Sequence, residues 1–366
     1  MNIAAGGYTE TELLKHLFSH NRSVWYEYTI ADINDRTIGK LDIESGKVSF
    51  DSRREIMRTF SASAKKSELM DINKMDERIV PWMCLKLNNG DVIKWALGRF
   101  IVQPSKSCER AVSTISINGY DLSKIAYDDK VDGRYYVPAG SVYTSAVAQL
   151  LGGLYNNLNV EFLPKTKQAD QEWEIGTSKL TIANELLRSI NYNPFYFNEY
   201  GNGIIEEYVN PANRPVELSY STVKNSIFLD SVEVETNRFD IPNKFIRYTE
   251  NVDSRYLISI YENNDVNSPF SIVNRGRMIV DAEMVNDIAT QADLDSYTIR
   301  AALSKMQGAE VLTFRSLNMP GHGYQTSLYV ECDLYDINNK YVETSWEMEL
   351  KTGGTMRHVC ERVLSI

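Results

Sequence analysis

The chain has 366 residues, of which 43% are hydrophobic, so it is long enough to bury a sizeable core over two or three domains. Its 49 acidic residues outnumber its 39 basic residues, and the formal net charge is −10. No stretch concentrates lysine and arginine, so tight binding of DNA or RNA is not expected. No segment approaches the roughly 20 apolar residues that span a bilayer, and the N-terminus lacks signal-peptide features. We therefore expect a soluble chain without a membrane anchor, made in the cytoplasm.

The aromatic and cysteine contents add two expectations. The 22 Tyr, 12 Phe and 5 Trp favour strands, where such side chains pack on a pleated face, and they predict a β-rich fold. The four cysteines are far apart in the sequence and form no CxxC pair: Cys84, Cys108, Cys332 and Cys360. Because the cytosol disfavours disulfides, we expect reduced thiols that are buried or half-buried.

The first predicted element is a helix over residues 9–20, within an N-terminal helical segment of residues 1–21. Thr9 and Glu12 fit a capping box. The apolar residues of this stretch fall on one helical face: Leu13, Leu14, Leu17 and Phe18.

Residues 22–127 are predicted to form a first antiparallel β-barrel domain. Strand-like runs occur at 24–30, 82–87, 92–95, 99–102 and 114–117. Residues 88–91 (Asn-Asn-Gly-Asp) separate two of these runs and predict a hairpin, because Asn-Gly tolerates positive φ angles.

Residues 128–210 are predicted to form a small α/β module. Its first helix has an apolar face made of Val142, Ala146, Val147, Leu150 and Leu151. We expect this helix to end at Gly152-Gly153, since glycine is common just past a helix C-terminus. A second helix is expected at about 181–190. Strand-like runs lie at 159–163, 195–197 and 204–208.

A second antiparallel β domain is predicted for residues 211–250 and 309–366, interrupted at 251–308 by a segment that contains a helix. Strand-like runs occur at 226–229, 232–235, 244–248, 309–314, 328–334 and 341–346. A helix at about 294–306 is expected to bury one apolar face: Ile299, Ala302, Leu303 and Met306. The predicted fold class is thus α+β, mainly β. No repeat of 20 to 50 residues is visible, which argues against a solenoid or a propeller.

The four histidines give no clear metal or catalytic site. His16 and His20 are spaced i, i+4 on the first helix, but residue 17 is Leu rather than the Glu of a zinc-protease helix, and no third ligand is apparent. We interpret the pair as part of a solvated helix face. His322 lies in a Pro-Gly-His-Gly stretch, which we interpret as a flexible connection between strands. The fourth histidine is His358.

Other chemical signatures are equally weak. No phosphate-binding loop or dinucleotide-binding glycine motif is present. Glu206 and Glu207 are adjacent, and Glu347 and Glu349 alternate with apolar residues, so we expect the latter two on the wet face of a strand. Residues 118–121 (Asn-Gly-Tyr-Asp) are interpreted as a turn in which Gly119 relieves backbone strain. The sequence therefore predicts no catalytic, cofactor-binding or metal-binding residues, and no enzyme.

Three groups of short motifs carry a family resemblance. The first joins residues 98–104 to 115–121, the second runs through 173–178, 193–197 and Gly201, and the third joins 241–245 to 267–271 and Gly276. In this order they resemble the baseplate hub family of phage tails, which also forms the N-terminal part of many siphophage tail-associated proteins. The resemblance covers most of the chain after about residue 22. It implies a hub with two antiparallel β-barrel domains and two small α/β modules in each chain, in which residues 211–250 and 309–366 form the second barrel and residues 251–308 the inserted module.

The resemblance also implies an assembly and partners. Three chains would close into a homotrimeric ring that adapts the sixfold tail tube or distal tail protein to a threefold tip. Further partners would be the tape measure protein and tip spike, fibre or receptor-binding proteins. DNA would pass through the lumen during ejection without specific binding, and the chain would belong to the virion after assembly in the host cytoplasm. Because the chain ends at Ile366, soon after its last predicted strands, we expect no lytic or receptor-binding extension.

Two alternatives remain open. Strands rich in Tyr and Trp also occur in carbohydrate-binding or receptor-binding modules, and binding on a glycan array would favour that function. A tail-associated cell-wall hydrolase with a cleft between domains is the other alternative, and zymography on bacterial cell walls would detect it.

Overall fold

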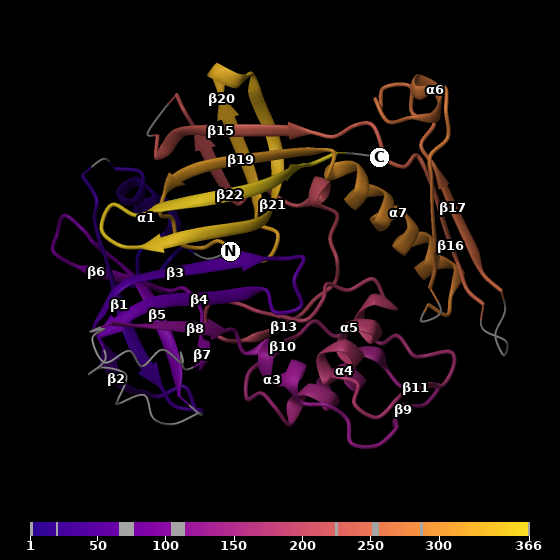
Figure 1. Cartoon of the computed structure of the whole chain (residues 1–366), viewed down its shortest axis with the longest axis horizontal. Coiled ribbons are helices and arrows are strands. Elements are labelled where there is room, and N and C mark those ends of the chain that lie inside the picture. Colours follow the sequence, from indigo (N-terminus) through magenta and orange to yellow (C-terminus); the bar gives the residue numbers. More distant parts are fainter. Residues whose placement is uncertain are drawn as a thin grey trace.

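The computed structural model describes residues 3–19, 21–65, 77–103, 114–223, 226–250, 256–285 and 288–364, and the protein is mostly β (Figure 1). The helices are α1 (Glu10–Leu17), α3 (Ser123–Asp128), α4 (Tyr143–Gly152), α5 (Lys179–Arg188), α6 (Ile272–Arg275) and α7 (Gln291–Gln307). Short 3-10 turns occur at Pro211–Asn213 and Asp333–Tyr335. Within these described ranges, no helix is long and apolar enough to cross a membrane.

The first β half contains eight strands, which are β1 (Ser23–Ala31), β2 (Thr37–Leu41), β3 (Ile43–Asp51), β4 (Arg58–Lys65), β5 (Arg78–Lys86), β6 (Val92–Ala96), β7 (Phe100–Gln103) and β8 (Thr114–Tyr120). They pair antiparallel in the order β3-β4-β8-β7-β5-β1-β2, and β6 pairs with β5. The hairpin expected at residues 88–91 is confirmed, and Gly90 has the positive φ of +95° that its turn requires.

The N-terminal helix docks on this first half. Thr9 caps α1 in a capping box with Glu12, as the sequence predicts. Leu13 and Leu17 are completely buried in the core beneath the strands. The Trp95 indole also donates a hydrogen bond of 2.9 Å to the Ile3 carbonyl oxygen, which holds the start of the chain against β6.

The second β half contains β14 (Leu218–Ser221), β15 (Phe228–Thr236), β19 (Glu310–Leu317), β20 (Ser327–Cys332), β21 (Ile337–Leu350) and β22 (Thr355–Arg362). Four of them follow the order β15-β19-β22-β21, β20 pairs with β21, and β14 pairs parallel with β20. An antiparallel arrangement was expected throughout, and this parallel pair departs from it. A strand of four residues gives too short an alternation to predict its partner or direction.

The two halves are joined into one 14-stranded sheet, because the last part of β21 pairs with β3. Among the described strands no closed barrel is found, so the expectation of two separate barrel domains is not confirmed. Alternating apolar and polar residues are equally compatible with a barrel and with an open, strongly twisted sheet. One apolar core, which includes Phe60 and Phe314, runs beneath both halves.

The first α/β module follows the first half. Its strands are β9 (Tyr135–Val137), β10 (Leu158–Val160), β11 (Gln171–Trp173), β12 (Tyr196–Phe197) and β13 (Gly203–Ile205). The predicted end of its first helix is confirmed, since α4 ends at Gly152. The module has its own apolar core, in which Leu151 and Leu186 are completely buried between α4 and α5.

The second α/β module consists of β16 (Lys244–Tyr248), β17 (Ile258–Glu262), β18 (Val280–Met284), α6 and α7. Its three strands form a separate sheet in the order β17-β16-β18. Residues 244–248, which we expected in the second barrel domain, thus pair within this module instead. The helix expected at 294–306 is confirmed as α7, but Ile299 is 44% exposed, because the buried face runs through Leu294, Thr298 and Ala302.

Three of the cysteines are buried free thiols, as expected: Cys84, Cys332 and Cys360. Burial raises the pKa of the Cys84 thiol to about 12 and also raises that of Cys360. Both thiols are therefore held in the unreactive neutral form. Cys108 lies outside the described residues.

Candidate functional site

Most of the polar residues singled out in the sequence have ordinary structural surroundings. His16 is half-buried on α1, whereas His20 lies outside the described residues. Glu347 and Glu349 share the wetter face of β21, as expected, where they pair with Lys47 and Lys351.

The other two acidic candidates do not face each other. The half-buried Glu206 accepts hydrogen bonds from Tyr196 at 2.9 Å and from Asn193 at 3.1 Å, while Glu207 is exposed. The Glu206 carboxylate is thus held inside its module by hydrogen bonds, whereas the Glu207 side chain faces solvent. The two acids therefore do not form a glycosidase-like pair.

The stretch at residues 118–121 is not a turn. Gly119 lies inside β8, where a Cβ atom would approach the Cβ of Phe100 to 3.0 Å, so glycine is needed for close packing rather than to relieve strain. Asp121 follows the strand and is 2% exposed. Its carboxylate accepts hydrogen bonds of 2.8 Å from the Arg58 backbone and 2.9 Å from the Ser123 backbone, which ties the start of β4 to α3.

Arg58 lies at the junction of the two β halves. Its guanidinium is 1% exposed and lies 5.4 Å from the ring centroid of Phe50 on β3 and 5.3 Å from that of Trp346 on β21. The two rings stack on each other at 6.0 Å. Cation–π contacts of this kind strengthen when water is excluded, so Arg58 reinforces the β3–β21 pairing.

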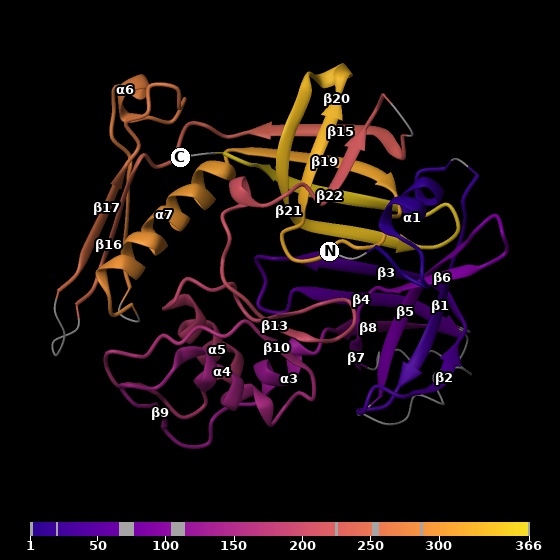
Figure 2. The same ribbon diagram turned by 180° about the vertical axis from the view of Figure 1, so that it is seen from behind.

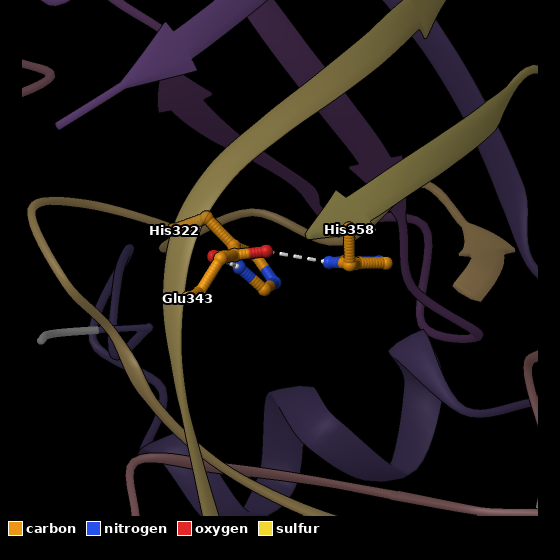
Figure 3. Close-up of side chains that lie close together, drawn as sticks. All are labelled: His322, Glu343 and His358. Atoms are coloured by element: carbon orange, nitrogen blue, oxygen red, sulfur yellow. Dashed lines mark hydrogen bonds and ion pairs between the residues drawn. The ribbon is translucent and has the colours of Figure 1, made fainter. Parts of the chain in front are cut away.

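The most unusual group of side chains is a buried cluster of His322, Glu343 and His358 (Figure 3). His322 comes from the loop between β19 and β20, Glu343 from β21 and His358 from β22. One Glu343 oxygen lies 2.5 Å from Nδ1 of His322, and the other lies 2.6 Å from Nδ1 of His358. All three side chains are almost completely inaccessible to solvent.

The remaining imidazole nitrogens also have partners. Nε2 of His322 lies 2.8 Å from the Tyr220 hydroxyl on β14, and Nε2 of His358 lies 2.8 Å from the Ser316 hydroxyl on β19. The Phe314 ring stacks on His358 with a centroid distance of 4.4 Å. The cluster therefore connects four strands and one loop through a fully hydrogen-bonded network.

The protonation states follow from burial and from the neighbours. Burial pushes the pKa of Glu343 upward, but the two imidazoles outweigh it, and the pKa is lowered overall. Burial lowers the pKa of His358 below its usual 6.5, although Glu343 partly opposes this. At neutral pH, Glu343 is thus a carboxylate and His358 is neutral.

Two histidines and a carboxylate are also metal-ligand types, but their spacing here fits hydrogen bonds. Zinc lies about 2.0 to 2.2 Å from its nitrogen and oxygen ligands, which separates neighbouring ligand atoms by roughly 3.3 Å in a tetrahedral site. Both nitrogen–oxygen distances to Glu343 are shorter than this. In this structure the three side chains are therefore spaced for hydrogen bonds with each other and not for a zinc ion between them.

Ser316, His358 and Glu343 stand in the order of a nucleophile, a base and an orienting carboxylate. All three are completely buried, and the Ser316 hydroxyl can also donate to the Leu317 carbonyl oxygen at 2.9 Å. A substrate has no route to Ser316 in this structure. The network satisfies polar groups inside the core instead of presenting them to a ligand.

Only part of this cluster was predictable from the sequence. His358 lies between Met356 and Cys360 on the inward-facing period of β22, which could have indicated burial. Glu343 was not predictable in this way, because the pairing of β21 with β22 shifts register between Glu343 and Ser345, and this irregularity turns Glu343 inward. His322 does connect two strands as expected, but it is 3% exposed rather than part of a flexible surface loop.

A shallow cavity of about 390 Å³ lies where α5 and α7 approach the loop after β3. Arg300 lines it, but its guanidinium donates to the Tyr192 carbonyl oxygen at 2.9 Å and lies 4.0 Å from the Tyr208 ring centroid. Glu185 accepts a 2.6 Å hydrogen bond from Trp173. Arg300 thus joins the two α/β modules, whereas Glu185 supports a contact within the first module, and these charged side chains do not form a preorganised ligand site.

No protein-family model matches the sequence, and no curated protein is similar to it in sequence. Solved structures do share its fold. A tail protein from Neisseria meningitidis has a TM-score of 0.66 at 12% identity, over 92% of this chain and 97% of its own. A 43 kDa tail protein of the Shewanella oneidensis prophage MuSo2 has a TM-score of 0.62 at 10% identity, over 92% and 98%.

A prophage tail protein from Listeria monocytogenes gives a TM-score of 0.55 at 11% identity, over 93% of this chain and 95% of its own. At such low identity the agreement concerns the fold. It extends over nearly the whole of each chain, so it involves both β halves and both modules together. The chain therefore has the fold of phage tail proteins, in agreement with the resemblance seen in its sequence motifs.

Proposed function

We propose that the chain is a structural subunit of a phage tail tip or baseplate hub and a component of the virion. The observation that carries this proposal is the agreement in fold with three tail proteins, two of them from prophages, over 92% to 93% of this chain and 95% to 98% of theirs. Agreement in both directions means that the whole architecture is shared rather than a single common domain.

In the proposed assembly, three chains form a ring around one axis. Each chain contributes two β halves, which act as two barrel-like units, so three chains supply six positions around the axis. Such a ring adapts a sixfold tail tube or distal tail protein to a threefold tip. The pairing of β3 with β21 supports this model, because it holds the two halves of each chain in a fixed orientation.

The ring would surround the channel through which DNA leaves the virion. The net charge of −10 supports a channel that repels DNA instead of binding it. The tape measure protein and a spike, fibre or receptor-binding protein are the further partners of this model. A role without catalysis fits the burial of Ser316, His358 and Glu343, which leaves the triad-like group without access.

The mass and symmetry of the purified full chain test this function. We expect a trimer in analytical ultracentrifugation and threefold particles in electron-microscope images, with an acidic lumen in their reconstruction. A chain that remains monomeric at all concentrations and also in the presence of a distal tail protein would contradict the ring. Clearing of bacterial cell walls in a zymogram would instead favour the hydrolase.

A further inference from the structure

The second α/β module has a sheet with only one covered face. Helix α7 packs on β16 and β17, and the core on this side contains Phe245 from β16 with Ala302 and Met306 from α7. In both views the strands lie farther from the rest of the chain than α7 does (Figures 1 and 2). The opposite side of the sheet therefore faces away from the protein.

The register of the strands defines what this outward side carries. Ile246 on β16 is opposite Ile260 on β17 and Ala282 on β18, and Tyr248 is opposite Ile258 and Met284. We call these six residues the outer sheet face: Ile246, Tyr248, Ile258, Ile260, Ala282 and Met284. Three of them are large apolar side chains that are 42% to 52% exposed, namely Ile258, Ile260 and Met284.

The outward side of these strands departs from the pattern expected for a sheet face that meets water. The helix-facing side carries Arg247, which is 2% exposed and pairs with Asp281 and Glu283, both at 3.1 Å. The outward side carries the continuous apolar rows. An antiparallel sheet that faces solvent normally presents polar side chains there, so this face has the composition of a covered surface.

The charges around the face indicate what can cover it. The next outward row contains Lys244 and Glu262, whose charges pair at 2.8 Å. No cation of that row is left to attract phosphate groups, so neither nucleic acid nor an anionic lipid surface is favoured. Two copies of this chain each have a net charge of −10, so they repel each other where acidic surfaces meet. The outer sheet face is neutral and apolar, so a second copy can approach it without this repulsion.

The size of the face points to one contact within a larger assembly. Three strands about 4.8 Å apart and five residues long cover roughly 250 Å², whereas a stable two-protein interface needs about 800 Å² from each partner. The face is thus too small to hold an independent pair of proteins together. It has the size of one contact in a closed ring, where every subunit uses two different surfaces.

We propose that the outer sheet face is a contact between copies of this chain, covered in the assembled ring by the neighbouring subunit. This inference rests on the proposed function, whose ring supplies the second copy. The face belongs to the second α/β module, which lies outside the 14-stranded sheet. This module thus acts as an arm that connects adjacent subunits.

Sedimentation of the full chain and of two matched variants tests this contact. Ile260→Glu places a carboxylate in the middle of the outer sheet face, and Ile175→Glu makes the same change at a residue that is 66% exposed on the other α/β module. We expect Ile260→Glu to weaken self-association on the order of 100-fold, because the carboxylate would be buried without a partner, while Ile175→Glu leaves it unchanged.

The possible results separate this inference from the proposed function. A trimer that persists in Ile260→Glu overturns the contact but leaves the ring in place. A wild-type dimer that Ile260→Glu dissociates supports the contact and overturns the ring. A wild-type monomer at every concentration overturns both, and the face would then belong to a different protein.

A labelling experiment keeps the test valid if Ile260→Glu fails to fold. In the wild-type background, Ile260→Cys and Ile175→Cys each add one exposed thiol, whose reaction with a maleimide is measured above that of the unmodified chain. We expect the thiol at position 260 to react at least about tenfold more slowly in the oligomer than in dilute monomer, and the thiol at 175 equally fast in both. Equal rates at position 260 would overturn the proposal.

Discussion

The two β halves share one continuous sheet and one apolar core, but they contribute different chemistry to that core. In the first half, the Phe60 ring packs at 5.3 Å from Phe100 and 6.1 Å from Tyr28. In the second half, the charged Glu343 holds two buried imidazoles. Aromatic packing has no proton to exchange in mildly acidic solution, whereas the cluster does. Mild acid therefore destabilises the protein through His358 in the second half, although the strands of the sheet are continuous.

The largest loss of stability is expected when the Glu343 carboxylate is removed from the second half. Glu343→Ala leaves the Nδ1–H groups of His322 and His358 without an acceptor inside the core. Because removal of one partner leaves the other buried polar groups without a hydrogen bond, we expect the free energy of unfolding to fall by about 3 to 5 kcal/mol. Urea denaturation followed by tryptophan fluorescence measures this change. Glu349→Ala, at a half-buried position on the same strand, is the control and should cost less than about 1 kcal/mol.

A change in the apolar half should be smaller and independent of pH. Phe60→Leu removes part of a completely packed ring and should lower the free energy of unfolding by about 1 to 2 kcal/mol. We expect the same loss at pH 5 and pH 7, since neither of its ring partners changes charge in this range: Phe100 has no proton to lose, and burial raises the pKa of Tyr28. A loss that depended strongly on pH would contradict the separation of the aromatic packing from the titratable cluster.

The loss of stability in mild acid should come from the second half, because the raised pKa of the buried Asp121 in the first half acts in the opposite direction. The pKa of His358 is lowered in the folded protein, so the unfolded chain takes up the proton first, and stability falls as the pH drops below about 6.5. The pKa of Glu343 is also lowered, so its contribution is lost as the pH falls below about 4.5. One proton gives a slope of at most about 1.4 kcal/mol per pH unit.

Unfolding by urea at a series of pH values between 7 and 5 checks this prediction. The wild type and Phe60→Leu should both lose stability through this window, and His358→Gln should lose much less. An unchanged slope in His358→Gln would show that other groups carry the pH dependence.

The smallest effect is expected at the surface of the junction between the halves. Lys47 on β3 and Glu347 on β21 pair across it at 3.0 Å, but both side chains are more than 40% exposed. Lys47→Ala should change the free energy of unfolding by no more than about 0.5 kcal/mol, because water and salt screen exposed pairs. A larger loss in urea denaturation would mean that the junction depends on its surface charges as well as on Arg58.

Local features of the fold were predictable from neighbouring residues. The capping box of Thr9 and Glu12, the hairpin at Gly90 and the end of α4 at Gly152 each depend on backbone preferences within a few positions. Such preferences act before any tertiary contact forms, and the sequence therefore shows them directly.

Long-range features were not predictable in this way. The pairing of β21 with β3 joins residues about 300 positions apart, and nothing in either strand specifies the other. The buried cluster depends on the register shift next to Glu343 and on a loop that carries His322 into the core. Both require the complete set of strand partners, which a single sequence does not display.

The length of β21 has a mechanical consequence. Its first residues pair with β20, its middle pairs with β22, and its final residues pair with β3, so a single strand is part of both halves. A force or torque on one half is therefore transmitted to the other half through the backbone hydrogen bonds between β21 and β3, which bear it together. The two halves should therefore tilt or rotate together as one rigid body, because the β3–β21 junction is a continuous part of the sheet and not a hinge.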